Sequence, residues 1–232
     1  MMTQPNVRLI VLGYMIVLST MFLFSFTFSP ITSLSWINGF HSDFMDAFFS
    51  TITHLGNGAF LVPLLVILLF KRLFMPVALA LCAISQGLLV VLLKRVIFFD
   101  AARPIAYIKN IPLHKVNGVD IHSTLSFPSG HAVTVFGICV FLSLCYRNIW
   151  FSLVLLVAAV LAGLSRVYLL QHFLIDVACG GTIGVVTAWI AYYVFAGKSN
   201  PGWLNERLEL NVSSTIDAGK SIGQDNRFGS FE

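Results

Sequence analysis

Charged side chains are scarce in this sequence. They make up only 10% of its 232 residues, whereas about 25% is usual for a soluble domain. Hydrophobic residues account for 57%, with 21 phenylalanines, so most of the chain must face a medium other than water. This composition excludes an ordinary soluble globule. The basic residues lie between apolar runs and are not gathered on one polar face, which argues against nucleic-acid binding.

Cysteine is rare as well, and its spacing indicates no cross-link. The four cysteines all lie inside apolar stretches and form no CxxC pair: Cys82, Cys139, Cys145 and Cys179. We interpret them as small buried hydrophobes and expect no disulfide. No pair of histidines has the spacing of a helical zinc motif either, so we predict neither a metal nor a cofactor.

Long hydrophobic runs, by contrast, are plentiful. About 20 apolar residues in a helix cross a hydrocarbon core about 30 Å thick, and six stretches can serve: about 7–28, 59–70, 73–93, 131–146, 149–164 and 172–195. The second is too short to cross the membrane by itself and would need residues 51–58 as well. We therefore predict an all-α protein, an integral membrane six-helix bundle with its active site at one membrane face. This domain comprises residues 1–196, and residues 197–232 are predicted to form a polar, disordered cytoplasmic tail.

The orientation follows from bases in short loops. If six helices alternate, five bases fall on one side: Arg8, Lys71, Arg72, Arg147 and Lys198. Bases also occur on the other side, so the count alone does not decide. Residues 29–50 have neither Lys nor Arg but are rich in aromatics, which predicts a loop or half-helix at the outer lipid interface. We expect a bacterial inner-membrane protein with both termini cytoplasmic and the active site facing the periplasm.

Polar clusters stand at the ends of the apolar runs, and helix alternation places all of them on one side of the membrane. They comprise Lys94 with Arg103, then Pro128-Ser129-Gly130-His131, then Ser165-Arg166, and lastly His172 with Asp176. Charged groups near hydrocarbon are costly and need partners, so such a collection predicts a functional site.

The residue types in these clusters suit an anion such as a phosphate. The first amides of the helix that begins at His131 are unpaired, and its dipole favours negative charge. Arg103 and Arg166 offer two guanidiniums, and Lys94 a mobile point charge. His172 and Asp176, four residues apart, are expected to share one helix face.

Asp176 could orient His172 as a nucleophile, because a carboxylate that accepts from one ring nitrogen leaves the other free to attack. His131, on the neighbouring helix end, is suited to protonate a leaving oxygen.

In order and spacing these residues resemble the three-part signature of the type 2 phosphatidic acid phosphatase superfamily, which shares its helical fold with vanadium haloperoxidases. The segments from Pro128 to His131 and from Ser165 to Asp176 match in full. The first part departs, since eight residues separate Lys94 from Arg103-Pro104 where the family usually has six. Arg95 does not restore the pattern, so either Lys94 or Arg95 is the candidate ligand.

The resemblance implies a metal-independent membrane phosphatase. His172 would attack phosphorus, Asp176 would orient it, and His131 would protonate the leaving oxygen and later activate water. The phosphate ligands would be Lys94, Arg103, Ser129, Gly130 and Arg166.

The implied substrate is a lipid phosphate mono- or pyrophosphoester: phosphatidylglycerophosphate, phosphatidic acid, undecaprenyl pyrophosphate or a lipid A phosphate. We expect no nucleic acid and no obligate protein partner. Two alternatives remain, a non-enzymatic lipid-phosphate binder or transporter and a vanadium haloperoxidase-like enzyme. Residues 105–127, which include His114 and His122, could cover the site.

Overall fold

The protein is described by a computed structural model, which covers residues 5–108 and 111–196. Every regular element in these two ranges is helical. In chain order they are α1 (Pro5–Thr27), α2 (Pro30–Gly39), α3 (Asp43–Ile52), η1 (Thr53–Gly56), α4 (Gly58–Leu69), α5 (Phe74–Leu92), η2 (Leu93–Ile97), α6 (Pro104–Tyr107), α7 (Gly130–Tyr146), α8 (Ile149–Tyr168) and α9 (Leu174–Phe195). The all-α prediction is confirmed for this part of the chain. The predicted tail, residues 197–232, lies outside it.

Four helices are long and apolar enough to cross a membrane: Asn6–Thr27, Phe74–Ile97, Ile149–Tyr168 and Leu174–Phe195. The bent pair Asp43–Gly56 and Gly58–Leu69, with an angle of 60° between its halves, could supply a fifth crossing. The central helix α7 is apolar but has only 17 residues. The structure therefore contains four or five crossings by length and composition, against the six that the sequence predicts.

Residues 51–58 do not extend α4 as one continuous helix. They form the end of α3, the short helix η1 and a bend, and α4 begins only at Gly58. Asn57 fixes this start, because its side-chain oxygen accepts a hydrogen bond from the amide of Ala59 at 3.0 Å. A residue in this N-cap position has non-helical backbone angles, so the helix cannot continue through it.

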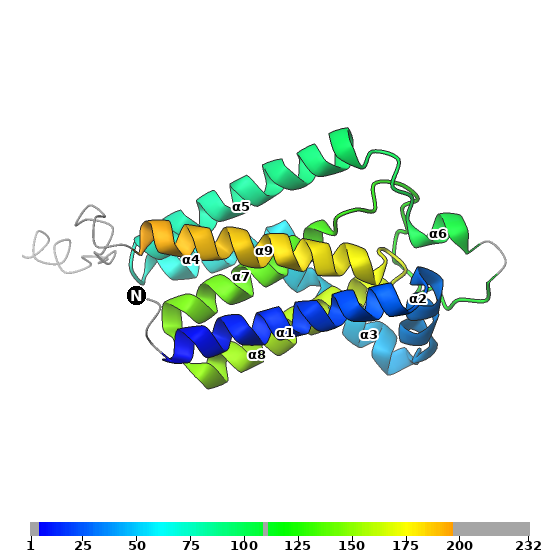
Figure 1. Ribbon diagram of the computed structural model, residues 1–232, viewed down its shortest axis with the longest axis horizontal. Helices are drawn as coiled ribbons and strands as arrows, with labels where there is room; N and C mark the ends of the chain where they lie inside the picture. Colours follow the sequence, from blue (N-terminus) through cyan, green and yellow to red (C-terminus); the bar gives the residue numbers. More distant parts are fainter. Residues whose placement is uncertain (1–4, 109–110, 197–232) are drawn as a thin grey trace, which may run out of the picture.

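For the base-free segment 29–50 the sequence left a loop or a half-helix open, and the structure has two short helices there, α2 and most of α3. Ser29 caps α2 by accepting from the amide of Thr32 at 3.1 Å, and Ser42 caps α3 by accepting from Met45 at 3.2 Å. Both helices lie at the end of the bundle opposite the first residues of α1 (Figure 1). This places α2 and α3 beside the turn between α8 and α9.

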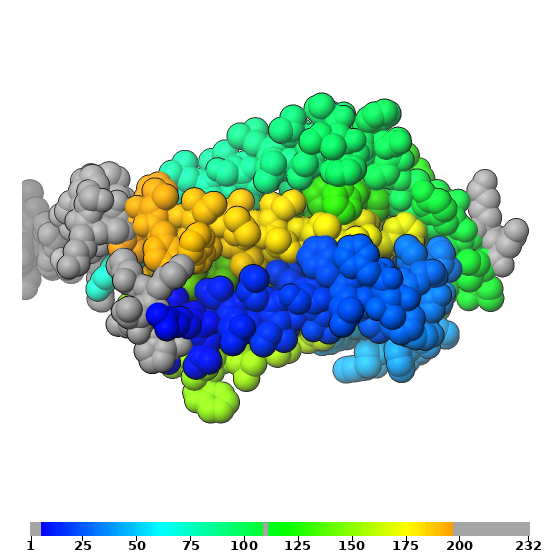
Figure 2. All heavy atoms as spheres, viewed as in Figure 1, coloured from blue at the N-terminus to red at the C-terminus, as the bar shows by residue number. Residues whose placement is uncertain are grey.

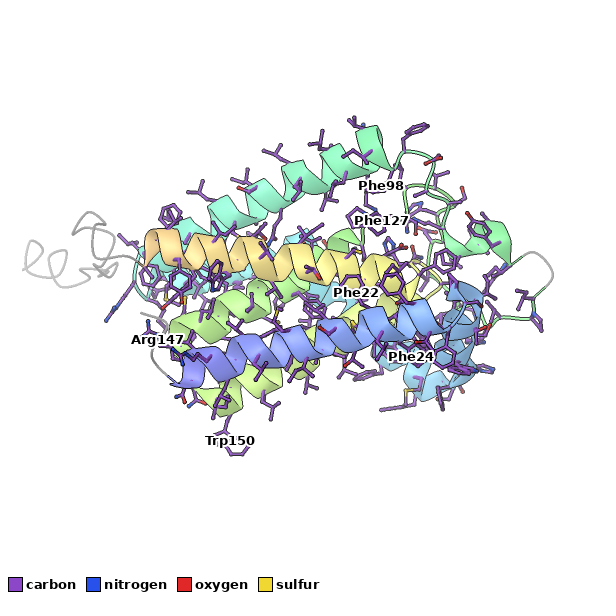
Figure 3. The ribbon with its side chains drawn as sticks, viewed as in Figure 1. Phe22, Phe24, Phe98, Phe127, Arg147 and Trp150 are labelled. Atoms are coloured by element: carbon purple, nitrogen blue, oxygen red, sulfur yellow. The ribbon has the colours of Figure 1, made fainter. Side chains whose placement is uncertain are left out.

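The long helices lie side by side around α7, which has twelve buried residues (Figure 1). In the space-filling view, α9 lies between α1 and α5 (Figure 2). Large apolar side chains are exposed on the outer faces of α1, α5, α8 and α9. Trp150, 74% exposed, points away from the bundle (Figure 3). Such an apolar exterior suits lipid rather than water.

Helices α7 and α9 pack closely because glycines on α9 face the backbone of α7. A Cβ added at Gly180 would lie 2.5 Å from the carbonyl oxygen of Ser129, and one at Gly184 would meet the carbonyl of Val133. Small residues at a helix contact let two backbones approach in this way. The position of α9 thus fixes the N-terminus of α7.

Candidate active site

The N-terminus of α7 is held by α9. Ser129 is the N-cap of α7, and its own amide donates to the carbonyl of Asp176 at 3.0 Å. The first hydrogen bond along the helix runs from the amide of Val133 to the carbonyl of Ser129. The amides of Gly130 and His131 therefore have no acceptor inside the helix, as the sequence predicts. The amide of Ser129, however, is already engaged.

His172 and Asp176 form a buried pair at the start of α9. The Nδ1 atom of His172 lies 3.4 Å from the Oδ2 atom of Asp176, and both residues are almost inaccessible to solvent. The same Oδ2 accepts from the hydroxyl of Ser126 at 2.5 Å and from the amide of Phe173 at 3.0 Å. Three neighbours thus fix this carboxylate.

The spacing predicted that His172 and Asp176 share one helix face, but in the structure they do not. His172 lies in the turn before α9, whose first residue is Leu174. Asp176 reaches it because a carboxylate in the first helical turn can fold back over the helix N-terminus, here to the amide of Phe173. The residues still meet, although by a different geometry.

The surroundings of His172 keep its imidazole neutral. Burial, first of all, lowers the pKa of His172 to about 4. The hydrogen bond and charge of Asp176 act in the opposite direction, while the positive charges of Arg103 and Lys94 lower the pKa further. At neutral pH the ring therefore carries no charge. With Asp176 accepting a hydrogen bond from the Nδ1–H group, the lone pair of Nε2 would be available for attack.

Arg103 is fixed beside this pair. Its Nε atom donates to the carbonyl of Thr124 at 2.9 Å, and Nη1 donates to the side-chain oxygen of Gln171 at 2.8 Å. Gln171 immediately precedes His172 and also donates to the carbonyl of Asp120 at 2.7 Å. Burial lowers the pKa of Arg103, and the nearby Asp176 partly offsets this.

Lys94, not Arg95, faces the site. The ammonium group of Lys94 donates to the carbonyl of Leu125 at 2.6 Å, whereas Arg95 is exposed. Lys94 belongs to the π-helical turn η2, in which the amide of Phe98 bonds to the carbonyl of Leu93. A π turn holds one residue more than an α turn, so η2 takes up part of the longer spacing between Lys94 and Arg103.

The aromatic rings of Phe98 and Phe127 contact each other between η2 and the segment before α7 (Figure 3). Their centroids are 4.6 Å apart.

Arg166 reaches the site from the last turn of α8. Its Nη1 atom donates to the hydroxyl of Thr53 at 2.8 Å. The prediction ended this helix near Leu164, but α8 continues to Tyr168, so Ser165 and Arg166 are helical.

Two predicted phosphate ligands have polar atoms that are buried and unpaired. Within residues 5–108 and 111–196, only the hydroxyl of Ser129 and the Nε atom of Arg166 are buried side-chain polar atoms without a hydrogen-bond partner. Buried polar groups in native proteins are nearly always paired, and each exception needs an explanation. An anion bound between them would supply the missing acceptor.

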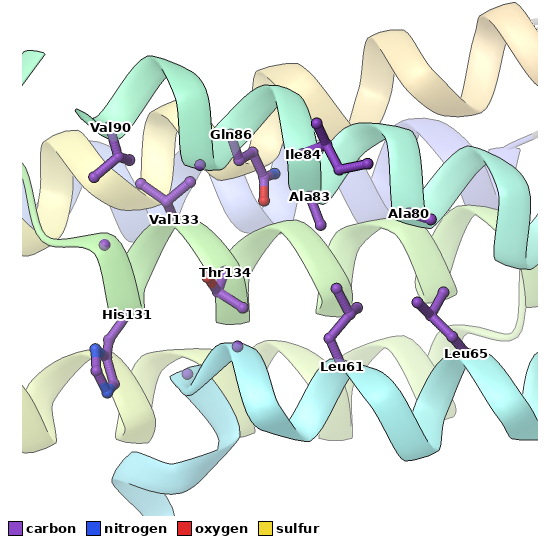
Figure 4. Close-up of a pocket in the computed structure, with 14 residues that line it drawn as sticks. Leu61, Leu65, Ala80, Ala83, Ile84, Gln86, Val90, His131, Val133 and Thr134 are labelled. Atoms are coloured by element: carbon purple, nitrogen blue, oxygen red, sulfur yellow. The ribbon is translucent and has the colours of Figure 1, made fainter. Parts of the chain in front are cut away.

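His131 lies in the first turn of α7, where it lines a cavity of about 540 Å³ (Figure 4). The cavity extends along α7 between α4 and α5, and most of its lining is apolar. His131 is thus placed between the buried cluster and an opening toward the outside of the bundle.

Residues 111–127 supply one side of the site. Ser126 contacts Asp176, and Thr124 and Leu125 bind the two cations described above. Farther out, His114 is anchored by Asp46 of α3 at 2.7 Å. His122 is exposed and makes no part of the cluster.

Sequence reasoning missed three residues that hold the predicted ones in place: Ser126, Gln171 and Thr53. Gln171 adjoins His172, and Ser126 lies two residues before Pro128, so proximity to a motif was a usable signal for these two. No sequence signal pointed to Thr53. Among the described residues, no group of three or more His, Cys, Asp or Glu side chains is placed to hold a metal ion.

Comparison with known proteins gives one family match and similar curated proteins. Residues 74–199 match the model of the PAP2 superfamily. The lipid A 4′-phosphatase of Bacteroides thetaiotaomicron is 34% identical over 68 residues, which are 29% of this chain and 30% of that protein. The lipid A 1-phosphatase of Porphyromonas gingivalis is 32% identical over 99 residues, 40% of this chain and 22% of that protein. Both matches span less than a third of these relatives.

Two solved structures have similar folds. LpxE of Aquifex aeolicus has 32% sequence identity and a TM-score of 0.60, covering 69% of this chain and 93% of its own. The first transmembrane PAP2 type phosphatidylglycerolphosphate phosphatase from Bacillus subtilis has a TM-score of 0.61 over 86% of this chain and all of its own, at 24% identity, which shows the fold alone. With the family match covering more than half of its length, the chain belongs to the PAP2 superfamily.

Proposed function

We propose that this protein is an integral membrane phosphatase that hydrolyses lipid phosphate mono- or pyrophosphoesters through a phosphohistidine intermediate, without a metal ion. The observation that carries the proposal is the pair of buried, unpaired groups on Ser129 and Arg166. They lie among residues that match the family signature, with Lys94 and Arg103 as further cations. Three positive charges against the single carboxylate of Asp176 favour a phosphate dianion.

In the first step, the Nε2 atom of His172 attacks phosphorus while Asp176 accepts a hydrogen bond from the Nδ1–H group and holds the ring. The bond from phosphorus to the lipid oxygen breaks, and His131 gives that oxygen a proton. In the second step, His131 takes a proton from water, whose oxygen attacks phosphorus and breaks the bond to His172. Inorganic phosphate leaves and the enzyme returns to its starting state.

The lipid character of the substrate is supported by the cavity that begins at Gly130 and His131. It continues between α4 and α5 over an apolar lining, so a phosphate bound at α7 can keep its hydrocarbon chains in contact with apolar surface. The names of the two curated relatives, both lipid A phosphatases, favour the lipid A phosphates among the four candidate substrates.

Release of inorganic phosphate by the full-length protein in detergent micelles tests this proposal. We expect release from at least one of four substrates: phosphatidylglycerophosphate, phosphatidic acid, undecaprenyl pyrophosphate or lipid A. The rate should not fall in EDTA, because protein cations already neutralise the phosphate. Binding without release would support the lipid-binder alternative, and halide oxidation after addition of vanadate would support the haloperoxidase alternative. Activity that EDTA removes and magnesium restores would contradict the metal-independent mechanism.

We further propose six membrane crossings, with α7 and the bent pair of α3–η1 and α4 as the two shorter ones. The site would then face the periplasm, and both termini would be cytoplasmic. The start of α1 and the end of α9 lie at the same end of the bundle, opposite α2 and α3 (Figure 1), which supports this arrangement.

Cysteine labelling in intact cells tests the orientation. Ser123, exposed on the site side, and Asn148, exposed in the turn between α7 and α8, lie at opposite ends of the bundle. With a membrane-impermeant thiol reagent, Ser123→Cys should react and Asn148→Cys should not, while both should react after the cells are opened. The parent chain, with its four native cysteines, is the control. The reverse pattern would place the site in the cytoplasm.

Substituting Gly180 tests whether α9 positions the site. In Gly180→Ala the new Cβ would meet the backbone of Ser129, which cannot yield without moving the start of α7. We expect kcat/KM to fall about 10²-fold, the size of effect that a misplacement of about 1 Å can produce.

Gly181→Ala is the matched control, because its Cβ would meet side chains and no backbone: the end of Leu18 at 2.7 Å, which can rotate away, and the ring of Phe136 at 3.3 Å. Equal kcat/KM values for the two variants would show that the close packing at Gly180 is not what aligns the site.

A further inference from the structure

Gln86 is a buried amide in the wall of the apolar cavity. It lies in the middle of α5, and only 5% of its surface is exposed. Most of the cavity lining is hydrocarbon, from residues such as Leu61, Leu65 and Val133. An uncharged polar group at such a position is costly unless its hydrogen bonds are made.

The hydrogen bonds of Gln86 determine which way its amide points. Its Nε2 atom donates to the hydroxyl of Thr187 on α9 at 2.7 Å. That hydroxyl donates to the carbonyl of Ile183 at 2.7 Å, so it needs a donor from Gln86 and cannot supply one. The amide nitrogen therefore faces α9.

The amide oxygen of Gln86 points the other way, toward the space between α5 and α7 (Figure 4). Within the described residues, no donor bonds to it. This oxygen is not one of the two buried unpaired atoms described above, so it is accessible from the cavity and presents an unpaired hydrogen-bond acceptor there.

This acceptor lies one helical turn from the phosphate site. Val90 packs against Gly130, where a Cβ would be 3.6 Å from its side chain. Gln86 precedes Val90 by four residues, which is about 6 Å along α5 at 1.5 Å per residue. On α7, Thr134 follows His131 by three residues and also lines the cavity. A lipid whose phosphate is bound at α7 would place the first atoms of its backbone at this depth.

We infer that Gln86 selects lipid phosphates that carry a hydrogen-bond donor, a hydroxyl or an amide N–H, within a few bonds of the phosphate. This inference rests on the proposed function. A bound lipid with such a donor satisfies the oxygen of Gln86. A lipid joined only through esters offers acceptors alone, so when it binds it covers that oxygen without a hydrogen bond, which disfavours it.

Three phosphomonoesters with equal chain lengths test the inference. Phosphatidic acid has no donor in its backbone, N-acyl 3-deoxysphinganine 1-phosphate has the amide alone, and N-acyl sphinganine 1-phosphate has the amide and a hydroxyl. We expect kcat/KM for one or both donor lipids to exceed that for phosphatidic acid about tenfold or more. Comparison of the two donor lipids shows whether the amide or the hydroxyl is recognised.

Two variants separate recognition from packing. In Gln86→Leu the acceptor is lost, so the ratio of kcat/KM between donor lipids and phosphatidic acid should fall toward one. In Thr187→Val one contact from α9 is lost, but Nε2 of Gln86 still has the Sγ atom of Cys82 at 3.3 Å and the carbonyl of Gly184 at 3.5 Å as acceptors. The amide oxygen therefore keeps its direction, and the ratio should stay high even if both rates fall. Because each ratio is measured on one preparation, it does not depend on the folded fraction.

The result can distinguish the two proposals. Equal rates for all three lipids in the unaltered protein, or an unchanged ratio in Gln86→Leu, would overturn the role of Gln86 and leave the phosphatase proposal standing. No release from any lipid would contradict the phosphatase proposal. The dissociation constants of the same lipids, measured in micelles, would then decide whether Gln86 discriminates in binding, with the same ratios expected and the same equality overturning the inference.

Discussion

Replacement of His172 by alanine is expected to abolish phosphate release from every substrate, with a loss of about 10⁴-fold or more in kcat. The reason is that no phosphoenzyme can form without the attacking nitrogen. The measurement is release of phosphate from both a lipid phosphate and an aryl phosphate, together with acid-free trapping of the labelled intermediate.

Folding of the His172→Ala variant must be checked, because the residue is buried. Retained affinity for inorganic phosphate would show that Ser129, Arg103 and Arg166 are still in place. His122→Ala, at an exposed position, is the matched control and should keep full activity. A labelled phosphoenzyme in His172→Ala would show that another residue is the nucleophile.

Replacement of His131 by alanine should have a different signature. If His131 chiefly protonates the departing oxygen, its loss should cost alkyl lipid phosphates about 10² to 10⁴-fold. An aryl phosphate with an acidic phenol leaves as an anion without that proton, so measurable cleavage should remain. The intermediate on His172 should accumulate, because activation of water also slows.

The measurement for His131→Ala is the ratio of rates for the two substrates, with the amount of trapped phosphohistidine. In His172→Ala both substrates should fail, which makes it the comparison that separates a nucleophile from an acid. An equal loss for both substrates in His131→Ala, with no trapped intermediate, would show that the roles are wrongly assigned.

Much of the site could be predicted because its residues stand at the ends of apolar runs. The alternation of helices correctly brought the four clusters to one end of the bundle, although Arg103 and Arg166 lie more than sixty residues apart. Short polar segments between hydrophobic stretches are easily recognised, since charge near lipid demands a reason.

Other features depended on contacts that a linear pattern does not contain. Lys94 rather than Arg95 faces the site, and Lys94 lies in the π turn η2. This turn is a local rearrangement of backbone hydrogen bonds that apolar periodicity does not indicate. The bend between α3 and α4 depends on the cap at Asn57, and the contact of Arg166 with Thr53 joins helices distant in sequence. The side-chain orientation of Gln86 was equally inaccessible, because it is set by Thr187 on another helix.

The hydrogen bond between Thr53 and Arg166 joins two parts of the chain with different relationships to the family. Arg166 lies within residues 74–199, which match the family model, whereas Thr53 and the α4 side of the cavity precede them. The cavity is therefore built from both parts, because its α5 and α7 walls lie within the matched residues and its α4 wall does not. A chimaera that exchanged only the portion before residue 74 would replace the α4 wall of the cavity and the Thr53 contact, while Gln86 and both histidines stayed in place.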